Sequence, residues 1–340
     1  MKKHFISAML SALLFLTGCS AESSPEPVQG TFFAMDTMMD FTIYGESGLI
    51  DQSESLIASL ESLVSVTDTG SELYAINQTG SGTLTGKASS LMEQALEICR
   101  RTDGALDLSI YPIVRAWGFT TGSYQVPDEA EIQALLPLVD YRKIQYDAAT
   151  GTVTVTLPEG MEIDLGSVAK GYAGQLAAQM LREHGVQSAL LNLGGNVQTV
   201  GAKPDGSPWQ IGIKDPQGED AMMVLSVEDQ AVVTSGGYER YFEQDGQTYW
   251  HIMDPSTGHP ADSGLISVTI VGDEGVVCDG LSTALFVMGL EKAADLWAQS
   301  GDFEAVFVTA SGEVYITEGL RDRFALTEQY ADTPVSVIER

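Results

Sequence analysis

The most constraining stretch of the sequence is 163–175, which reads IDLGSVAKGYAGQ. Residues 163–165 are typical of the end of a strand, Gly166 supplies a turn, and residues 168–180 follow a helical apolar pattern. A glycine turn that leads into a helix leaves backbone N–H groups free at the helix start, where they suit a phosphate. This stretch therefore predicts a strand, a turn and a helix, with an anion site at the turn.

Two polar side chains in this stretch are candidates for binding a ligand. Lys170 lies in the first turn of the expected helix, where its ammonium group would reach a phosphate oxygen. Asp164 precedes the turn and would hold a ribose hydroxyl or a ring nitrogen. An ordinary strand-to-helix turn with a solvated lysine explains the same residues equally well, so both interpretations stay open here.

The rest of the chain mixes strand patterns and helix patterns without regular alternation. This mixture favours the α+β class over a strict βαβ arrangement. The expected strands are a pair or one bent strand over 31–45, a hairpin over 143–164, single strands at 188–193, 197–200, 209–213, 224–227, 231–234 and 267–271, and a closing hairpin over 304–317. The expected helices are 49–66, 91–101, 129–136, 168–180, 277–289 and 290–300.

The N-terminus has the pattern of a bacterial lipoprotein signal. Two lysines, an apolar run over 5–16 and small residues precede Cys19. The run is too short for a permanent membrane span, so we expect a signal peptide over 1–18 and lipidation of Cys19. Residues 19–30 are polar and rich in proline, which indicates a flexible tether. An ordinary secretory signal with a chance cysteine is the alternative.

The charge balance excludes some classes of partner. The 340 residues carry a formal net charge of −30, and loss of the two lysines of the signal makes it more negative. A chain this acidic is unsuited to bind nucleic acid through its surface. Cys99 and Cys278 both lie in apolar helical patterns, so we expect buried thiols and no disulfide. The cysteine spacing predicts no zinc or iron–sulfur site.

Asp279 and Thr283 are candidate ligands for a divalent cation. They lie four residues apart on an expected helix and therefore share one face. A carboxylate and a hydroxyl are hard oxygen donors that suit Mg²⁺, which adds waters and a phosphate from its ligand. Asp279 also lies near the helix start, so a capping role is the competing interpretation.

His251 is a candidate general base or acid. It precedes Asp254-Pro255-Ser256-Thr257-Gly258, a turn signature that would hold it in a fixed place. A histidine that is merely hydrogen-bonded within the loop is the alternative. The sequence lacks a G-x-G-x-x-G after an early strand, a Walker A motif and a G-x-S-x-G motif, which excludes Rossmann dehydrogenases, P-loop kinases and α/β-hydrolases.

Taken together, the motifs resemble the ApbE family, the FAD:protein FMN transferases. The resemblance covers nearly all of the chain after the signal and rests on stretches that occur in the family's order. These are Ala34-Met35-Asp36-Thr37, Ser71-Glu72-Leu73, 107–119, 163–173, 192–196, 234–242, 251–260 and 279–289.

The resemblance implies a fold and an activity. We expect mixed sheets with packed helices, related to the T-fold, in two intimately associated subdomains that span 31–325, followed by a C-terminal tail over 326–340. Such enzymes use Mg²⁺ to cleave FAD, attach FMN by a phosphoester to a threonine of an acceptor flavoprotein, and release AMP. With the signal, this implies a lipid-anchored enzyme on the extracytoplasmic face of the cell membrane.

The resemblance also implies roles for single residues. Carried over by motif, the residues that hold the metal are Ser167, through its carbonyl, Asp279 and Thr283. The residues that line the FAD site are Met35, Ala105, Leu106, Asp107, Asp164, Lys170, His251 and Ile252. His251 would be the base that activates the threonine hydroxyl, and Asp279 counts as catalytic through the metal.

Two departures from the family pattern stand out. Thr67-Asp68-Thr69 replaces a segment in which many members carry an aromatic residue, and Asp36 replaces a frequent glycine. Without an aromatic residue at 67–69 to stack on the flavin, two alternatives stay open. One is an Mg²⁺-dependent pyrophosphatase that converts FAD to FMN and AMP, and the other is a lipoprotein that binds FAD without catalysis.

Overall fold

The computed structural model describes residues 26–340, so the expected signal peptide and Cys19 lie outside the described residues. The α-helices are α1 (Gly48–Val64), α2 (Glu72–Thr79), α3 (Gly86–Arg101), α4 (Tyr111–Ala116), α5 (Glu129–Leu135), α6 (Gly166–Glu183), α7 (Gly275–Met288) and α8 (Leu290–Gln299). None of these helices has the length and apolar content needed to span a bilayer.

A nine-stranded sheet runs through the molecule in the order β1-β2-β6-β7-β10-β13-β14-β15-β17. Its neighbours are antiparallel except for β15 and β17, which are parallel. The strands are β1 (Val28–Ala34), β2 (Thr37–Ile43), β6 (Ala189–Leu193), β7 (Asn196–Val200), β10 (Ala231–Gly236), β13 (Leu265–Gly272), β14 (Phe303–Thr309), β15 (Val314–Thr317) and β17 (Val335–Ile338).

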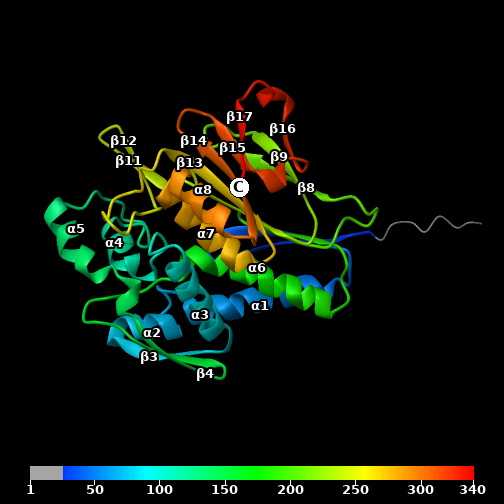
Figure 1. Cartoon of the computed structure of the whole chain (residues 1–340). Coiled ribbons are helices and arrows are strands. Elements are labelled where there is room, and N and C mark those ends of the chain that lie inside the picture. Colours follow the sequence, from blue (N-terminus) through cyan, green and yellow to red (C-terminus); the bar gives the residue numbers. More distant parts are fainter. Residues whose placement is uncertain (1–25) are drawn as a thin grey trace, which may run out of the picture.

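Smaller sheets surround this large sheet. They are β3 (Ser81–Thr85), β5 (Thr152–Thr156) and β4 (Gln145–Ala149); β16 (Phe324–Leu326), β9 (Ala221–Val227) and β8 (Trp209–Lys214); and the hairpin β11 (Tyr241–Gln244) with β12 (Gln247–Trp250). Helices α1, α6 and α7 cover one face of the large sheet, and the β16-β9-β8 sheet packs on the other (Figure 1). This arrangement confirms the expected α+β class.

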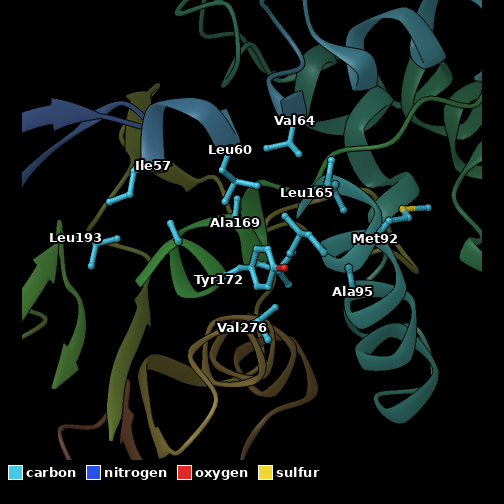
Figure 2. Close-up of a cluster of buried hydrophobic side chains, with 14 of the residues drawn as sticks. Ile57, Leu60, Val64, Met92, Ala95, Leu165, Ala169, Tyr172, Leu193 and Val276 are labelled. Atoms are coloured by element: carbon cyan, nitrogen blue, oxygen red, sulfur yellow. The ribbon is translucent and has the colours of Figure 1, made fainter. Parts of the chain in front are cut away.

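The largest part of the core lies between the helices and the first strands. Figure 2 shows Tyr172 of α6 near its centre, with side chains of α1, α3 and α7 around it. Ile57 and Leu60 of α1 are fully buried, as are Met92 and Ala95 of α3. Burying apolar side chains from four helices in one cluster fixes the position of α6, the helix that the sequence singled out.

Helices α6 and α7 cross at two glycines. A Cβ added to Gly171 would lie 2.1 Å from the carbonyl oxygen of Gly275, and one added to Gly275 would lie 2.4 Å from that of Gly171. Only hydrogen in place of a side chain allows the two backbones to approach this closely. The crossing brings the second turn of α6 against the first turn of α7, which places Asp279 beside α6.

The structure corrects several expectations. Residues 163–165 form no strand. The Asn77 side chain holds this segment, because it hydrogen-bonds both the N–H and the carbonyl of Ile163. The expected tail over 326–340 contains β17, a strand of the large sheet, and β1 begins at Val28 within the expected tether. The β11–β12 hairpin was not expected, because its side chains are largely exposed and lack an apolar alternation.

Candidate functional site

Two adjoining cavities form a cleft at the start of α6. The first, the Asp279 cavity, has a volume of about 210 Å³ and the second, the Asp164 cavity, about 200 Å³. Both are lined by Met35, Asp36, Gly166, Lys170 and Arg240. Of the residues predicted for the site, Met35, Ser167, Lys170, His251, Asp279 and Thr283 line the Asp279 cavity, and Met35, Asp164 and Lys170 line the Asp164 cavity.

Turns of two hairpins form one wall of the Asp279 cavity. Met35 and Asp36 connect β1 to β2 with positive φ values of 49° and 59°, the left-handed conformation that glycine adopts most easily. Aspartate is among the residues other than glycine that tolerate this conformation, so Asp36 fits the turn. Gly194, between β6 and β7, approaches Thr37 so closely that a Cβ would lie 2.0 Å from the Thr37 hydroxyl.

Asp279 is the buried carboxylate of the cleft, with 6% of its surface exposed. Its Oδ2 accepts a 2.7 Å hydrogen bond from the Gly171 N–H. Burial raises the pKa of Asp279 to about 6, although the Lys170 charge and the Gly171 bond oppose that rise. The raised pKa means that burying the charged carboxylate is unfavourable. A bound cation would compensate that charge, so Asp279 is suited to act as a ligand to a cation.

Oxygen atoms of α6 and α7 meet in the same cavity. Thr283 lies one turn after Asp279, and its hydroxyl is 3.3 Å from the Ser235 hydroxyl. The Gly171 N–H would normally be donated to the Ser167 carbonyl, four residues earlier in the helix. A carbonyl oxygen has two lone pairs, so the Ser167 carbonyl can take another partner in addition to a helical hydrogen bond.

The donor set fits Mg²⁺ rather than a transition metal. Across residues 26–340, no group of three or more His, Cys, Asp or Glu side chains is arranged to hold a metal ion. A single carboxylate with hydroxyl and carbonyl oxygens is what Mg²⁺ takes when phosphates and waters complete its octahedron. In the same cavity the buried Asn196 side chain lies beside the Asp279 carboxylate and helps to oppose the rise in its pKa.

His251 follows β12 and lines the Asp279 cavity. Its Nδ1 lies 3.2 Å from the carbonyl oxygen of Arg240, which can only accept, so Nδ1 carries the proton and the Nε2 lone pair is free. Burial, together with the charges of Arg240 and Lys170, lowers the pKa of His251 to about 4, although the hydrogen bond to the Arg240 carbonyl opposes this shift. The imidazole is therefore neutral near pH 7 and is able to accept a proton at Nε2.

The Asp164 cavity combines a carboxylate with apolar walls. Asp164 accepts a 2.8 Å hydrogen bond from the Gly166 N–H, and burial raises its pKa. Met35, Val64 and Val66 supply apolar surface, and Thr67 completes the wall. The residues that line this cavity include no aromatic ring, which agrees with the departure noted at 67–69.

Four residues predicted for the FAD site lie outside the cleft. Leu106 and Ile252 are buried in hydrophobic clusters. Asp107 is buried, and its oxygens accept hydrogen bonds from Ser109 and from the Tyr141 N–H. Ala105 lines a third cavity of about 520 Å³, the Ala105 cavity, formed by 102–105, 254–256 and the ends of α7 and α8.

Sequence reasoning missed several residues of the cleft. Arg240 and Glu239 lie between β10 and β11, and Asn196 begins β7. Arg240 and Asn196 stood within stretches that carried the resemblance, but no spacing rule assigned them a role. The signal that would have found them is the pair of glycine turns, Gly194-Gly195 and Gly236-Gly237, which bring backbone close to a ligand.

Comparisons with known proteins agree with this geometry. A model of the ApbE family matches residues 35–307. An FAD:protein FMN transferase of Klebsiella pneumoniae is 36% identical over 285 residues, which cover 82% of this chain and 88% of the relative. One from Treponema pallidum is 34% identical over 291 residues, covering 81% of this chain and 80% of the relative.

Solved structures have the same fold. The ApbE protein of Thermotoga maritima superimposes with a TM-score of 0.81 at 31% identity, covering 88% of this chain and 99% of that one. A histidine-to-glycine variant of the flavin transferase ApbE of Vibrio cholerae gives a TM-score of 0.76 at 27% identity, with the same coverage. These likenesses confirm the expected fold and the resemblance that the motifs indicated.

Proposed function

This chain belongs to the ApbE family, and from that membership we propose that it is an FAD:protein FMN transferase. The observation that carries the proposal is the convergence of Asp279, Thr283 and Ser167 with Lys170 and His251 in one cavity. Transfer of a phosphoryl-linked group requires oxygen ligands for a cation, a cationic side chain and a neutral base.

We propose that the diphosphate of FAD lies in the Asp279 cavity. The Lys170 ammonium would bind its oxygens. The N–H groups of Gly166, Val168 and Ala169 are already donated to Asp164 and Leu165, so the first turn of α6 leaves few backbone donors for the ligand. Lys170 makes no ion pair within residues 26–340, so its charge is available to a ligand. An Mg²⁺ held by Asp279, Thr283 and the Ser167 carbonyl would neutralise the charge that develops as AMP departs.

His251 is proposed as the base for the incoming hydroxyl. Its Nε2 would take the proton of the acceptor threonine as the threonine oxygen attacks the flavin-side phosphorus of FAD. The phosphorus–oxygen bond to AMP breaks and AMP carries away the bridging oxygen. The Nδ1 bond to the Arg240 carbonyl holds the imidazole in the tautomer that this step needs.

The two halves of FAD have separate places in this proposal. The flavin half would enter the Asp164 cavity, where apolar walls take the ring system and Asp164 accepts from a ring N–H or a ribityl hydroxyl. The adenosine half would extend toward the Ala105 cavity. Val287 lines that cavity and shares a face of α7 with Asp279 and Thr283. It lies eight residues after Asp279, which is about 12 Å along the helix axis.

The acceptor is proposed to be an extracytoplasmic or membrane-bound redox protein. This rests on the signal pattern over 1–18 and on lipidation of Cys19, which would anchor the enzyme on the outer face of the membrane. Radiolabelled palmitate should therefore appear in the wild-type protein expressed in a bacterial host and be lost in Cys19→Ala.

One incubation separates this function from its alternatives. The purified protein is mixed with FAD, Mg²⁺ and a candidate acceptor protein, and the products are read by intact mass and nucleotide chromatography. A transferase gives AMP together with an acceptor heavier by one FMN less water, and its Thr→Ala acceptor variant stays unmodified.

The same incubation shows how the proposal fails. A pyrophosphatase gives AMP and free FMN in equal amounts, whether or not the acceptor is present. A binding protein without catalysis returns FAD intact after incubation with Mg²⁺. Omission of Mg²⁺ with excess EDTA should abolish AMP release; release at an unchanged rate would remove the metal from the proposal.

A further inference from the structure

Arg240 occupies the junction of the two cavities. Arg240 lines both the Asp279 cavity and the Asp164 cavity, and so does Lys170 of α6. Neither the motif spacing nor the family resemblance gave Arg240 a role. A cation that reaches both compartments is placed to contact whatever part of a ligand passes between them.

The guanidinium is held in place with most of its donors free. One Nη2 N–H donates a 2.8 Å hydrogen bond to the carbonyl oxygen of Phe119. Four of its five N–H groups therefore remain for other partners. Within residues 26–340 Arg240 forms no ion pair, although the chain has 47 acidic residues and 17 lysines and arginines. An anchored guanidinium without a carboxylate partner suits an anionic ligand.

The charge of Arg240 acts on groups in both cavities. It opposes the rise in the pKa of Asp164 on one side and contributes to the lowered pKa of His251 on the other. The backbone of the same residue also positions the proposed base, because the Arg240 carbonyl accepts from the His251 N–H at 3.0 Å and from Nδ1 at 3.2 Å. An anion bound by this guanidinium would therefore lie near the imidazole.

We propose that Arg240 is a substrate-binding residue that holds the flavin-side phosphate of FAD, the phosphate that is transferred to the acceptor. This inference rests on the proposed function, which puts the flavin in the Asp164 cavity and the diphosphate in the Asp279 cavity. The first phosphate beyond the ribityl chain then lies at the junction, within reach of the fork of N–H donors. The AMP-side phosphate lies further along, toward α7.

The test compares the binding of the two halves of the substrate. Dissociation constants for FMN and for AMP, each with Mg²⁺, are measured by calorimetry on the purified wild-type protein, Arg240→Gln and Arg240→Lys. A hydrogen-bonded charge contact to phosphate is worth about 1.5–3 kcal/mol, so FMN binding should weaken about 10- to 100-fold in Arg240→Gln. Arg240→Lys, which keeps the charge without the planar fork, should lose less. AMP affinity should change less than about threefold in either variant.

Controls separate a local effect from a loss of structure. Arg321→Gln removes the same charge from an exposed ion pair with Glu339 and should bind FMN and AMP as the wild type does. Thermal melting of each variant checks that it is folded, and Arg240→Lys preserves a donor to the Phe119 carbonyl if Arg240→Gln is unstable.

Each outcome bears on a different claim. Unchanged FMN affinity in folded Arg240→Gln, or equal losses for FMN and AMP, would overturn the assignment of Arg240 to the flavin-side phosphate. A wild-type protein that binds neither FAD, FMN nor AMP would reject the proposed function itself. Wild-type binding together with unaltered Arg240 variants would reject only this inference.

Discussion

At the scale of single residues, Asp279 is the side chain on which the proposed metal site depends most. In Asp279→Asn, Mg²⁺-dependent release of AMP from FAD should fall at least about 100-fold, because a neutral amide is a poor ligand for Mg²⁺. The fold should persist, since the amide oxygen still accepts from Gly171 and the raised pKa shows that the buried charge is itself unfavourable. Activity is followed by chromatography and stability by thermal melting.

A matched control exists for this change. Asp147→Asn removes a carboxylate from an exposed position on β4, outside the residues that line the cleft, and should leave both rate and melting unchanged. AMP release at the wild-type rate in Asp279→Asn would mean that the cation is not held by this residue.

A second prediction at this scale concerns the protonation of His251. Its pKa in the folded protein is about 4, against 6.5 for a free histidine. Because the folded-state pKa is lowered, the stabilising effect of a neutral His251 is complete above pH 6.5 and disappears as the pH falls toward 4. The loss amounts to at most about 3 kcal/mol. His251→Gln should therefore lose less stability than the wild type over this interval in denaturant titrations.

The same residue gives a spectroscopic readout. The imidazole signals of His251, assigned by their absence in His251→Gln, should show no titration between pH 5 and 8. A midpoint close to 6.5 in this titration would contradict the half-buried, neutral state described for this side chain.

Residue types and spacing identified part of the site. Asp279 and Thr283 share a cavity as their four-residue spacing predicted, and Lys170 and Ser167 reach it from α6. Arg240 escaped notice because its significance depends on contacts with Phe119 and His251, which are distant in sequence or formed through backbone atoms. Such contacts exist only after the chain has folded.

At the scale of elements, the crossing of α6 and α7 creates the site. Gly171→Ala should destabilise the protein by about 1–3 kcal/mol or more, because its Cβ would meet the Gly275 carbonyl and the Asp279 side chain. FAD cleavage should fall as well, since moving α7 displaces Asp279. Chemical denaturation and AMP release measure the two effects.

A glycine without neighbours serves as the control for this substitution. A Cβ at Gly48, the first residue of α1, would meet nothing within 4 Å, so Gly48→Ala should change stability by no more than about 0.5 kcal/mol. If Gly171→Ala proved equally harmless, the helices would have room to separate and the glycine crossing would not fix the site.

Helices were predictable where apolar periodicity was strong, as in α1, α3 and α8. The strand assigned to 163–165 was wrong because a short apolar run indicates burial without specifying strand pairing. Ile163 and Leu165 are buried against helices, and hydrogen bonds to Asn77 replace those of a strand neighbour. The β11–β12 hairpin, which the sequence did not predict, is stabilised by aromatic stacking. The ring centroids of Phe242 and Tyr249 are 5.2 Å apart.

At the scale of the whole molecule, the C-terminal residues complete the large sheet. Deletion of 327–340 removes β17, uncovers the edge of β15 and exposes the surface that Val337 and Ile338 cover. The expected loss of stability is at least about 3 kcal/mol, at about 1.5 kcal/mol for each of these side chains, because the packing of Tyr330 and its hydrogen bond to Asp215 are lost as well. Deletion of 339–340 alone leaves β17 intact and should cost little. Equal melting temperatures for the two truncated proteins would mean that residues 326–340 are a tail that does not stabilise the fold.

The order of the elements in the sequence does not predict that β17 pairs with β15. β17 lies parallel to β15, and a parallel pairing needs a crossover, here formed by 318–334 with β16 in a different sheet. Local patterns specify strands, whereas the partner of each strand depends on packing between distant segments. The α+β class could therefore be predicted from the sequence, whereas the order of the nine strands in the large sheet could not.

The central claim is that oxygen atoms from α6 and α7 hold a divalent cation at the start of α6. Its most direct test is an anomalous difference map from crystals grown with Mn²⁺ in place of Mg²⁺ and soaked with FAD. We expect one strong peak in the Asp279 cavity, within coordination distance of the Asp279 carboxylate, the Thr283 hydroxyl and the Ser167 carbonyl. A peak elsewhere on a bound FAD, or bound FAD with no peak, would contradict it.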